Sequence, residues 1–226
     1  QAGAWGMSTG LQYVPGSFAD LDDLAAIAQV VGAAGGIYAS HIRDEGDQLL
    51  EAIDEALEVG RRANLPVHIS HLKASKQTNW GKVKAAAALT NSARDPAARD
   101  QAAGSNRRVT ADQYPYDASS TSISAMLLPD EEREGGSKAI VAKLDDPAQA
   151  PRLRELVAES LAARGPIMIA RCPEHPTWIG KLISDVAKTE NRFEVDVAFD
   201  IFRSSDDQGV SFSMNEEDVR YVMTLP

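Results

Sequence analysis

Two histidines follow two neighbouring apolar segments of the chain. His41 ends the segment GIYASH, and His71 ends the segment PVHISH, with a single helical pattern between them. In a parallel strand–helix–strand unit, both residues would lie at the carboxyl ends of adjacent strands, where α/β barrels keep their active sites. Two neutral imidazoles that meet at one point suit a divalent metal, and zinc most of all. We therefore predict that His41 and His71 are metal ligands.

The alternation of side chains along a strand separates a third histidine from this pair. Residues 37, 39 and 41 share one face of the first strand, and residues 67, 69 and 71 share one face of the second. His68 has the opposite parity, so we expect it to face the helix layer and to be structural. We interpret His175, in a distant segment, as structural too.

Other polar residues near the same strand ends are candidates for binding an anion. Lys73 lies two residues after His71. It is either a solvated loop lysine or a cation that holds a substrate carboxylate. Asp112 and Tyr114 share parity at the end of the next strand, where a phenol can donate to an anionic or carbonyl oxygen. Aromatic packing around a turn is the alternative. Residues 119–122 offer hydroxyl donors, although a polar loop looks the same.

Several other classes of protein are excluded or not indicated. The 226 residues carry a formal net charge of −10, which argues against a nucleic-acid partner because such a partner requires a basic face. There is no apolar run of about 18 residues, so no membrane-spanning helix is expected. The sequence has neither a Gly-rich phosphate loop nor a nucleophile elbow. Its single cysteine, Cys172, is interpreted as structural or incidental and fits a reducing cytoplasm.

The elements that must position these residues alternate in type. Strands are predicted at residues 4–11, 37–40, 67–70 and 108–113, with helical patterns after each of the first three and a polar loop at 95–106. Ser17 is the expected N-cap of the first helix, with Asp20 three residues on as in a capping box. Asp44, Glu45 and Asp47 precede the second helix, where acidic residues favour its N-terminus. This order is typical of a parallel sheet or barrel.

The pattern changes after residue 120. Residues 129–138 are charged and contain glycine, so an exposed loop is expected there. Helices are predicted at residues 145–163, 179–188, 195–202 and 216–223, and short strands at 166–170 and 210–213.

Four segments in register resemble the D-aminoacylases, which are N-acyl-D-amino-acid deacylases of the metal-dependent amidohydrolase superfamily. They are residues 3–16 (GAWGMSTGLQYVPG), 39–45 (ASHIRDE), 69–73 (ISHLK) and 112–116 (DQYPY). The resemblance thins beyond about residue 120, although residues 214–220 (MNEEDVR) are similar to the family's helix before the final barrel strand.

The resemblance implies an α/β fold of the (β/α)₈ TIM-barrel type, incomplete here, with barrel strands 1–3 and 8 outside the chain. We expect barrel units over residues 1–124, an insertion over the active site at 125–166, and the remaining barrel helices and strand at 167–226. Because the sequence does not begin with methionine and opens inside an expected strand, we expect an internal piece of a longer protein.

The resemblance also implies roles for individual residues. His41 and His71 would be zinc ligands from barrel strands 5 and 6. The residues that match the family's contacts to the substrate carboxylate and amide are Lys73, Tyr114, Ser120 and Tyr13. The family's His-x-His motif and bridging cysteine would lie upstream, and its general-base aspartate would follow Pro226. No catalytic residue of that kind is therefore assigned within the chain.

The implied activity is zinc-dependent hydrolysis of N-acyl-D-amino acids to a D-amino acid and a carboxylate. The implied partner is thus a small molecule, with neither nucleic acid nor membrane involved, and the sequence makes no prediction of oligomeric state. Two alternatives stay open: another amidohydrolase activity, such as that of a cyclic amidase or a deaminase, and a catalytically inactive fragment. Lys73, Tyr114 and Ser120 favour a substrate with a free carboxylate.

Overall fold

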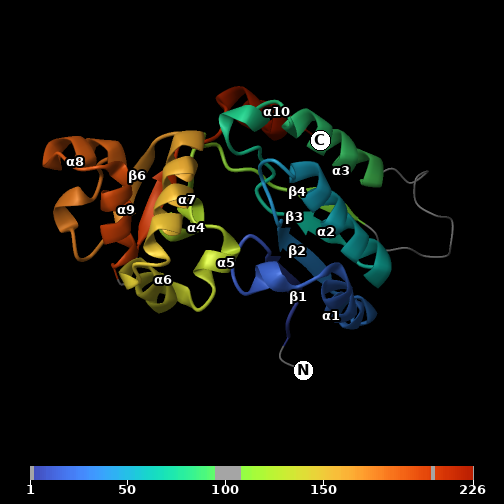
Figure 1. Cartoon of the computed structure of the whole chain (residues 1–226). Helices are drawn as coiled ribbons and strands as arrows, with labels where there is room; N and C mark the ends of the chain where they lie inside the picture. Colours follow the sequence, from blue (N-terminus) through green and yellow to red (C-terminus); the bar gives the residue numbers. More distant parts are fainter. Residues whose placement is uncertain (1–2, 95–107, 205–206, 226) are drawn as a thin grey trace. The chain divides into compact units, whose positions relative to one another are not determined.

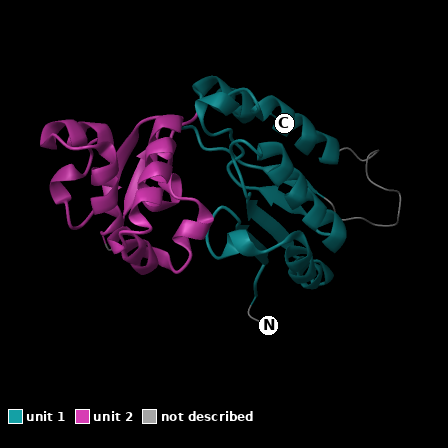
Figure 2. Cartoon of the chain, viewed as in Figure 1, with its two compact units in different colours: residues 1–116, 215–226 teal, residues 117–214 magenta. Residues whose placement is uncertain are grey.

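The computed structural model describes residues 3–94, 108–204 and 207–225 (Figure 1). The loop expected at residues 95–106 lies outside these described ranges. The chain divides into two compact units, drawn in teal and magenta in Figure 2. Unit 1 comprises Gln1–Tyr116 and Asn215–Pro226, and unit 2 comprises Asp117–Met214. Among the described helices, none combines the length and apolar character needed to cross a membrane.

Unit 1 is built on a parallel four-stranded sheet in the order β1-β2-β3-β4. Its strands are β1 (Gly6–Gly10), β2 (Ile37–His41), β3 (Val67–Ile69) and β4 (Val109–Ala111). Its α-helices are α1 (Leu21–Ala33), α2 (Leu49–Ala63), α3 (Val83–Arg94) and α10 (Glu216–Met223). The predicted alternation of strands and helices up to β4 is confirmed.

One face of this sheet is buried in the core of unit 1. Tyr38, Val67 and Ile69 from the strands belong to the same core cluster as Leu49 and Ile53 from α2. All five side chains are at most 3% exposed. Burial of each such side chain stabilises the folded state by about 1.5–3 kcal/mol, so this face holds the strands against the helices. The opposite face of the sheet is left for other side chains.

The start of α1 differs from the prediction. Its N-cap is Asp20, whose Oδ1 accepts hydrogen bonds from the backbone N–H groups of Asp22 and Asp23, each at 2.9 Å. Ser17 lies instead in the 3₁₀ turn Gly16–Phe18. The capping box uses Glu or Gln at its fourth position, and the shorter Asp20 is itself a good cap directly before the first apolar residue.

Unit 2 contains a separate three-stranded antiparallel sheet in the order β5-β7-β6. Its strands are β5 (Ser119–Thr121), β6 (Ile167–Arg171) and β7 (Gln208–Ser211). Its α-helices are α4 (Ile123–Leu127), α5 (Asp130–Arg133), α6 (Gly136–Asp145), α7 (Ala150–Ala163), α8 (Ile183–Glu190) and α9 (Glu194–Phe202). The unit has its own core, to which Leu127, Val157 and Ile169 belong.

The exposed loop expected at residues 129–138 is wrong, because α5 and the first turn of α6 lie there. The first turn of α5 is acidic, which suits the positive end of a helix dipole. Glu132 of this turn also pairs with Lys143 of α6 at 2.9 Å. The helix expected over 145–163 begins only at Ala150, since α6 ends at Asp145.

The two units divide the chain differently from the three expected segments. Residues 125–166 and 167–214 share one core, and β5 adds residues 119–121 to their sheet. The chain returns to unit 1 at α10, where Asp218 accepts a hydrogen bond from the Gly81 N–H at 2.7 Å. Within unit 2, the first and last residues are also joined, because the Met214 N–H donates to the Asp117 carbonyl at 3.1 Å.

Candidate metal centre

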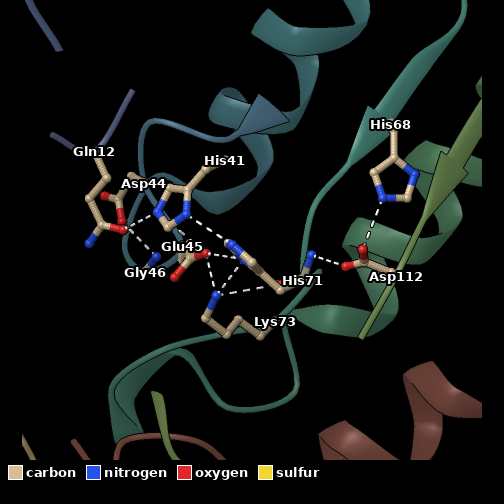
Figure 3. Close-up of polar contacts among 9 residues, drawn as sticks. All are labelled: Gln12, His41, Asp44, Glu45, Gly46, His68, His71, Lys73 and Asp112. Atoms are coloured by element: carbon tan, nitrogen blue, oxygen red, sulfur yellow. Dashed lines mark hydrogen bonds and ion pairs between the residues drawn. The ribbon is translucent and has the colours of Figure 1, made fainter. Parts of the chain in front are cut away.

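The ends of β2 and β3 bring His41 and His71 together (Figure 3). The two strands are parallel neighbours, with Ser40 opposite Ile69. His41 is the last residue of β2, and His71 follows β3 by two residues. Nδ1 of His41 lies 2.9 Å from Nε2 of His71, and the two rings meet nearly edge to face at an interplanar angle of 73°. The expected meeting of these histidines is therefore found.

The face expected for His68 is wrong. The strand register pairs His68 with Ala39, so it lies on the same face as His41, while Val67 and Ile69 enter the core. Nδ1 of His68 lies 2.8 Å from Thr110 Oγ1, and its Nε2 lies 3.0 Å from Asp112 Oδ2.

A turn after β3 directs the side chain of His71 into the site, and the alternation of side chains along the strand does not. β3 ends at Ile69, and His71 has a φ of 43°, in the left-handed region. Strand parity therefore does not predict its direction, because the backbone has already left the extended conformation.

Asp112 holds this turn in place. Its Oδ1 accepts a hydrogen bond from the backbone N–H of His71, and its carbonyl accepts one from Leu72 at 2.9 Å. Burial alone would raise the pKa of the Asp112 carboxyl, but the hydrogen bonds from His68 and from the His71 backbone leave that pKa below its usual range. Asp112 thus stays ionised and fixes the backbone of His71.

Glu45 is a member of the site that the sequence interpretation missed. It is 6% exposed, and its Oε1 lies 2.9 Å from His71 Nδ1 and 3.8 Å from His41 Nε2. It was expected to act on the N-terminus of the following helix. Asp44 instead stabilises the turn before this helix, since its carboxylate accepts hydrogen bonds from the N–H groups of Gly46 and Gln48.

Lys73 is buried, so its interpretation as a solvated loop lysine is wrong. It is 3% exposed, and its Nζ donates to Glu45 Oε1 and lies 2.8 Å from His71 Nδ1. Burial lowers the pKa of this ammonium, and the charge of Glu45 opposes that effect. Its Nζ also lies 5.5 Å from the ring centroid of Tyr114. Burial is the main cause that raises the pKa of Tyr114, and the negative charge of Glu45 adds to it. The hydroxyl of Tyr114 therefore stays protonated and can donate a hydrogen bond.

The remaining predicted residues lie in the loop after β1 and in unit 2. The ring of Tyr13 lies 5.0 Å from that of His41, and Oε1 of Gln12 lies 2.7 Å from His41 Nε2. Gln12 was not predicted. Ser120 belongs to unit 2, where it lies in β5 opposite Val210.

The two facing histidine nitrogens fit a zinc ion, and Glu45 is a third potential ligand close by. His41, Glu45 and His71 each offer one ligand atom, and these atoms all lie within 4.8 Å of one another. Two ligands of a tetrahedral zinc lie roughly 3–4 Å apart, close to the observed separation of the two facing nitrogens. Burial lowers the pKa of His41 to about 4, with Glu45 opposing this and His71 and Lys73 adding to it. The ring is therefore neutral at pH 7, as a metal ligand must be.

The outer nitrogens of both rings face oxygen atoms. Gln12 Oε1 is placed to accept a proton from Nε2 of His41, and Glu45 Oε1 from Nδ1 of His71. With those tautomers, the two facing nitrogens both keep their lone pairs. Outer acceptors of this kind commonly accompany metal-binding histidines.

Comparisons with known sequences point to one family. The search of family models found no match. An N-acyl-D-glutamate deacylase of Alcaligenes xylosoxydans xylosoxydans is 42% identical over 130 residues, which are 58% of this chain and 24% of that protein. A D-aminoacylase of the same organism is 29% identical over 224 residues, which are 99% of this chain and 37% of that protein.

Comparisons with solved structures agree. The crystal structure of an N-acyl-D-glutamate deacylase from Bordetella bronchiseptica, complexed with zinc and a phosphonate inhibitor, has a TM-score of 0.72 and 28% identity. The match covers 100% of this chain and 38% of that one. A crystal structure of D-aminoacylase, described as defining a subset of amidohydrolases, has a TM-score of 0.68 and 27% identity, over 98% of this chain and 37% of that one.

The chain therefore spans well under half the length of these relatives, and its α/β structure with a parallel sheet corresponds to part of theirs. By sequence and by structure, the chain resembles part of the D-aminoacylases and N-acyl-D-amino-acid deacylases.

Proposed function

We propose that this protein hydrolyses the amide bond of N-acyl-D-amino acids in a zinc-dependent reaction, giving a D-amino acid and a carboxylate. The observation that carries the proposal is the meeting of His41 Nδ1 and His71 Nε2 at 2.9 Å, beside the buried ammonium of Lys73. A partial metal site next to a fixed cation suits a substrate that has both an amide bond and a free carboxylate. The relatives named above, which are N-acyl-D-glutamate deacylases and D-aminoacylases, support the same substrate class.

His41 and His71 are the residues that would hold the metal. When bound, zinc supplies Lewis acidity that polarises an amide carbonyl and lowers the pKa of water to about 7. The 226 residues contain no His-x-His motif. We propose that further ligands and a general-base aspartate complete the site within a (β/α)₈ barrel, as the family resemblance implies.

Lys73 and Tyr114 would bind the substrate carboxylate. Lys73 offers a buried positive charge, and Tyr114 keeps its proton because its pKa is raised. We propose that Tyr13 and Ser120 add contacts to the carboxylate or the amide. Holding the carboxylate would fix the chiral centre relative to the metal, which is a positioning effect. Selection for the D-enantiomer would then depend on where the side-chain pocket lies relative to this anchor.

The test is a set of hydrolysis assays on the complete gene product loaded with zinc. We expect release of the free amino acid from N-acetyl-D-methionine, N-acetyl-D-glutamate or N-acetyl-D-aspartate, and little from the L-enantiomers. Turnover of a cyclic imide in place of these substrates would assign a cyclic amidase. Stoichiometric zinc without any hydrolysis would assign a non-catalytic module.

A further inference from the structure

The carboxylate of Glu45 contacts both the proposed metal-binding part and the proposed substrate-binding part of the site. Its Oε1 contacts His71, a proposed zinc ligand, and Lys73, the proposed anchor for the substrate carboxylate. The side chains of Glu45 and Lys73 are 7% and 3% exposed, so neither exchanges its partner freely for water. Figure 3 shows the side chains of Glu45, His71 and Lys73 converging, with His41 close to Glu45 as well.

The first step concerns the proton on His71. For Nε2 to bind a metal, the single N–H of the neutral ring must lie on Nδ1, and this N–H needs an acceptor. Nδ1 lies 2.9 Å from Glu45 Oε1 and 2.8 Å from Lys73 Nζ. An ammonium is a donor only, so Glu45 is the group that can stabilise the tautomer with a free Nε2. Lys73 favours the opposite tautomer, in which Nδ1 accepts.

The second step concerns the position of Lys73. An ammonium buried to this degree is costly unless an opposite charge is paired with it. Glu45 supplies that charge and accepts a hydrogen bond from Nζ, which also donates to the His71 carbonyl at 3.3 Å. Removing the carboxylate would therefore release Lys73 from its position beside His71.

We propose that Glu45 is a positioning residue that serves both halves of the site. It accepts the Nδ1 hydrogen bond of His71 so that Nε2 is free for zinc, and it orients Lys73 for a substrate carboxylate. Zinc affinity and recognition of the carboxylate then depend on one buried side chain. The effect of Glu45 on substrate binding rests on the proposed function. Its effect on zinc binding rests only on the geometry of the histidines.

The test measures zinc affinity by chelator competition on the metal-free, complete gene product, without substrate. Glu45→Met removes the acceptor at similar length, and we expect zinc to bind about 10–100-fold more weakly, as is usual when an outer acceptor of a ligating histidine is lost. Glu45→Gln keeps an acceptor oxygen but no charge, so it should lose less.

Two further variants separate folding from positioning. Glu45→Met alone leaves Lys73 buried without a carboxylate partner, whereas Glu45→Met combined with Lys73→Met removes both charges at similar volume and should fold. The double variant should bind zinc as weakly as Glu45→Met, and Lys73→Met alone should keep the affinity of the unaltered protein. Glu55→Gln is the matched control, since Glu55 pairs with Arg43 at 2.8 Å and its side chain is 18% exposed. It should leave zinc affinity unchanged.

The effect of Glu45 on substrate binding is tested with zinc at a saturating concentration. Glu45→Gln and Lys73→Met should each raise KM for N-acetyl-D-methionine, and combining them should raise it no further, because both act through one ammonium. Independent, additive effects on KM would contradict the shared role.

The outcomes distinguish this proposal from the proposed function. If the unaltered protein hydrolyses N-acetyl-D-methionine but the Glu45→Met and double variants bind zinc normally, the role of Glu45 is overturned and the function stands. If zinc affinity falls as expected but no N-acyl-D-amino acid is hydrolysed, the positioning of His71 is supported and the function is overturned. An equal loss of zinc in Lys73→Met or Glu55→Gln would also overturn the role of Glu45.

Discussion

Both units place a histidine shortly after the end of a strand, and the two surroundings differ. In unit 1, β2 and β3 are parallel neighbours, so their carboxyl ends lie at one edge and His41 faces His71. In unit 2, β6 pairs with the antiparallel β7, and Arg171 at the end of β6 lies opposite Gln208 at the start of β7. His175 follows β6 and stacks on Trp178, with ring centroids 3.9 Å apart.

The comparison teaches that strand direction matters as much as residue type. Unit 2 also has Cys172 and Glu174 beside its histidine. Burial raises the pKa of the Cys172 thiol, however, which disfavours the thiolate that binds metals. Within the described ranges, three metal-binding groups come within reach of one another at His41, Glu45 and His71. Parallel strands concentrate such side chains at one edge because their ends coincide.

The largest effect should come from removing a histidine at the parallel strand ends. We expect His71→Ala to abolish stoichiometric zinc binding, because one imidazole of the facing pair is lost. His175→Ala should retain full zinc content, since its ring is occupied with Trp178. Zinc per protein, measured by elemental analysis after dialysis, compares the two. Loss of zinc in His175→Ala would break the contrast between the units.

Removing the metal should affect the two units unequally. A ligand present at 100 times its Kd stabilises the folded state by about 2.7 kcal/mol. We expect zinc to slow amide hydrogen exchange in β2 and β3 of unit 1 and to leave β6 and β7 of unit 2 unchanged. Hydrogen exchange read by mass spectrometry, with and without a chelator, tests this. Equal protection of both sheets would show that the site is not confined to unit 1.

The turn at His71 offers a smaller effect. Asp112→Ala removes the acceptor of the His71 N–H and should cost about 1–2 kcal/mol of unfolding free energy while weakening zinc binding. Asp207 of unit 2 has a similar local role, since its Oδ1 accepts the N–H of Ile123 at 2.8 Å. Asp207→Ala should therefore lower the melting temperature without changing zinc affinity. Denaturation and chelator competition on both variants provide the readout.

The smallest effect belongs to the exposed surface of unit 1. Hydrogen bonds from Arg61 and Arg62 lower the pKa of Glu58 to about 2. A carboxyl with a depressed folded-state pKa stabilises the fold above its unfolded pKa of 4.5, and this stabilisation is lost as the pH falls from 4.5 towards 2. Solvent screening limits it to about 0.5 kcal/mol. Glu58→Gln should thus flatten the pH dependence of urea unfolding slightly, and less so in high salt.

Periodicity and chain order predicted the parallel sheet of unit 1 and the meeting of His41 with His71. These features follow from local patterns and from the rule that parallel strand ends coincide. The face of His68 could not be predicted, because β3 is only three residues long and the left-handed turn at His71 resets the direction of the following side chains.

Adjacent residues with similar chemistry also limited the prediction. Asp44 and Glu45 are both acidic, yet Asp44 caps the chain before α2 and Glu45 enters the site. Only the path of the backbone decides between them. The antiparallel sheet of unit 2 was missed for a related reason, since β5 pairs with β7 across about ninety residues and no local pattern encodes that choice.

The hydrogen bond between Met214 and Asp117 has a consequence for how such a molecule can change over time. It places the entrance and the exit of unit 2 side by side, and unit 2 has a core of its own. A segment whose two ends meet can be lengthened, shortened or exchanged while the flanking backbone keeps its path. The histidines of unit 1 can thus be inherited unchanged while the 98 residues of Asp117–Met214 diverge in sequence and in length.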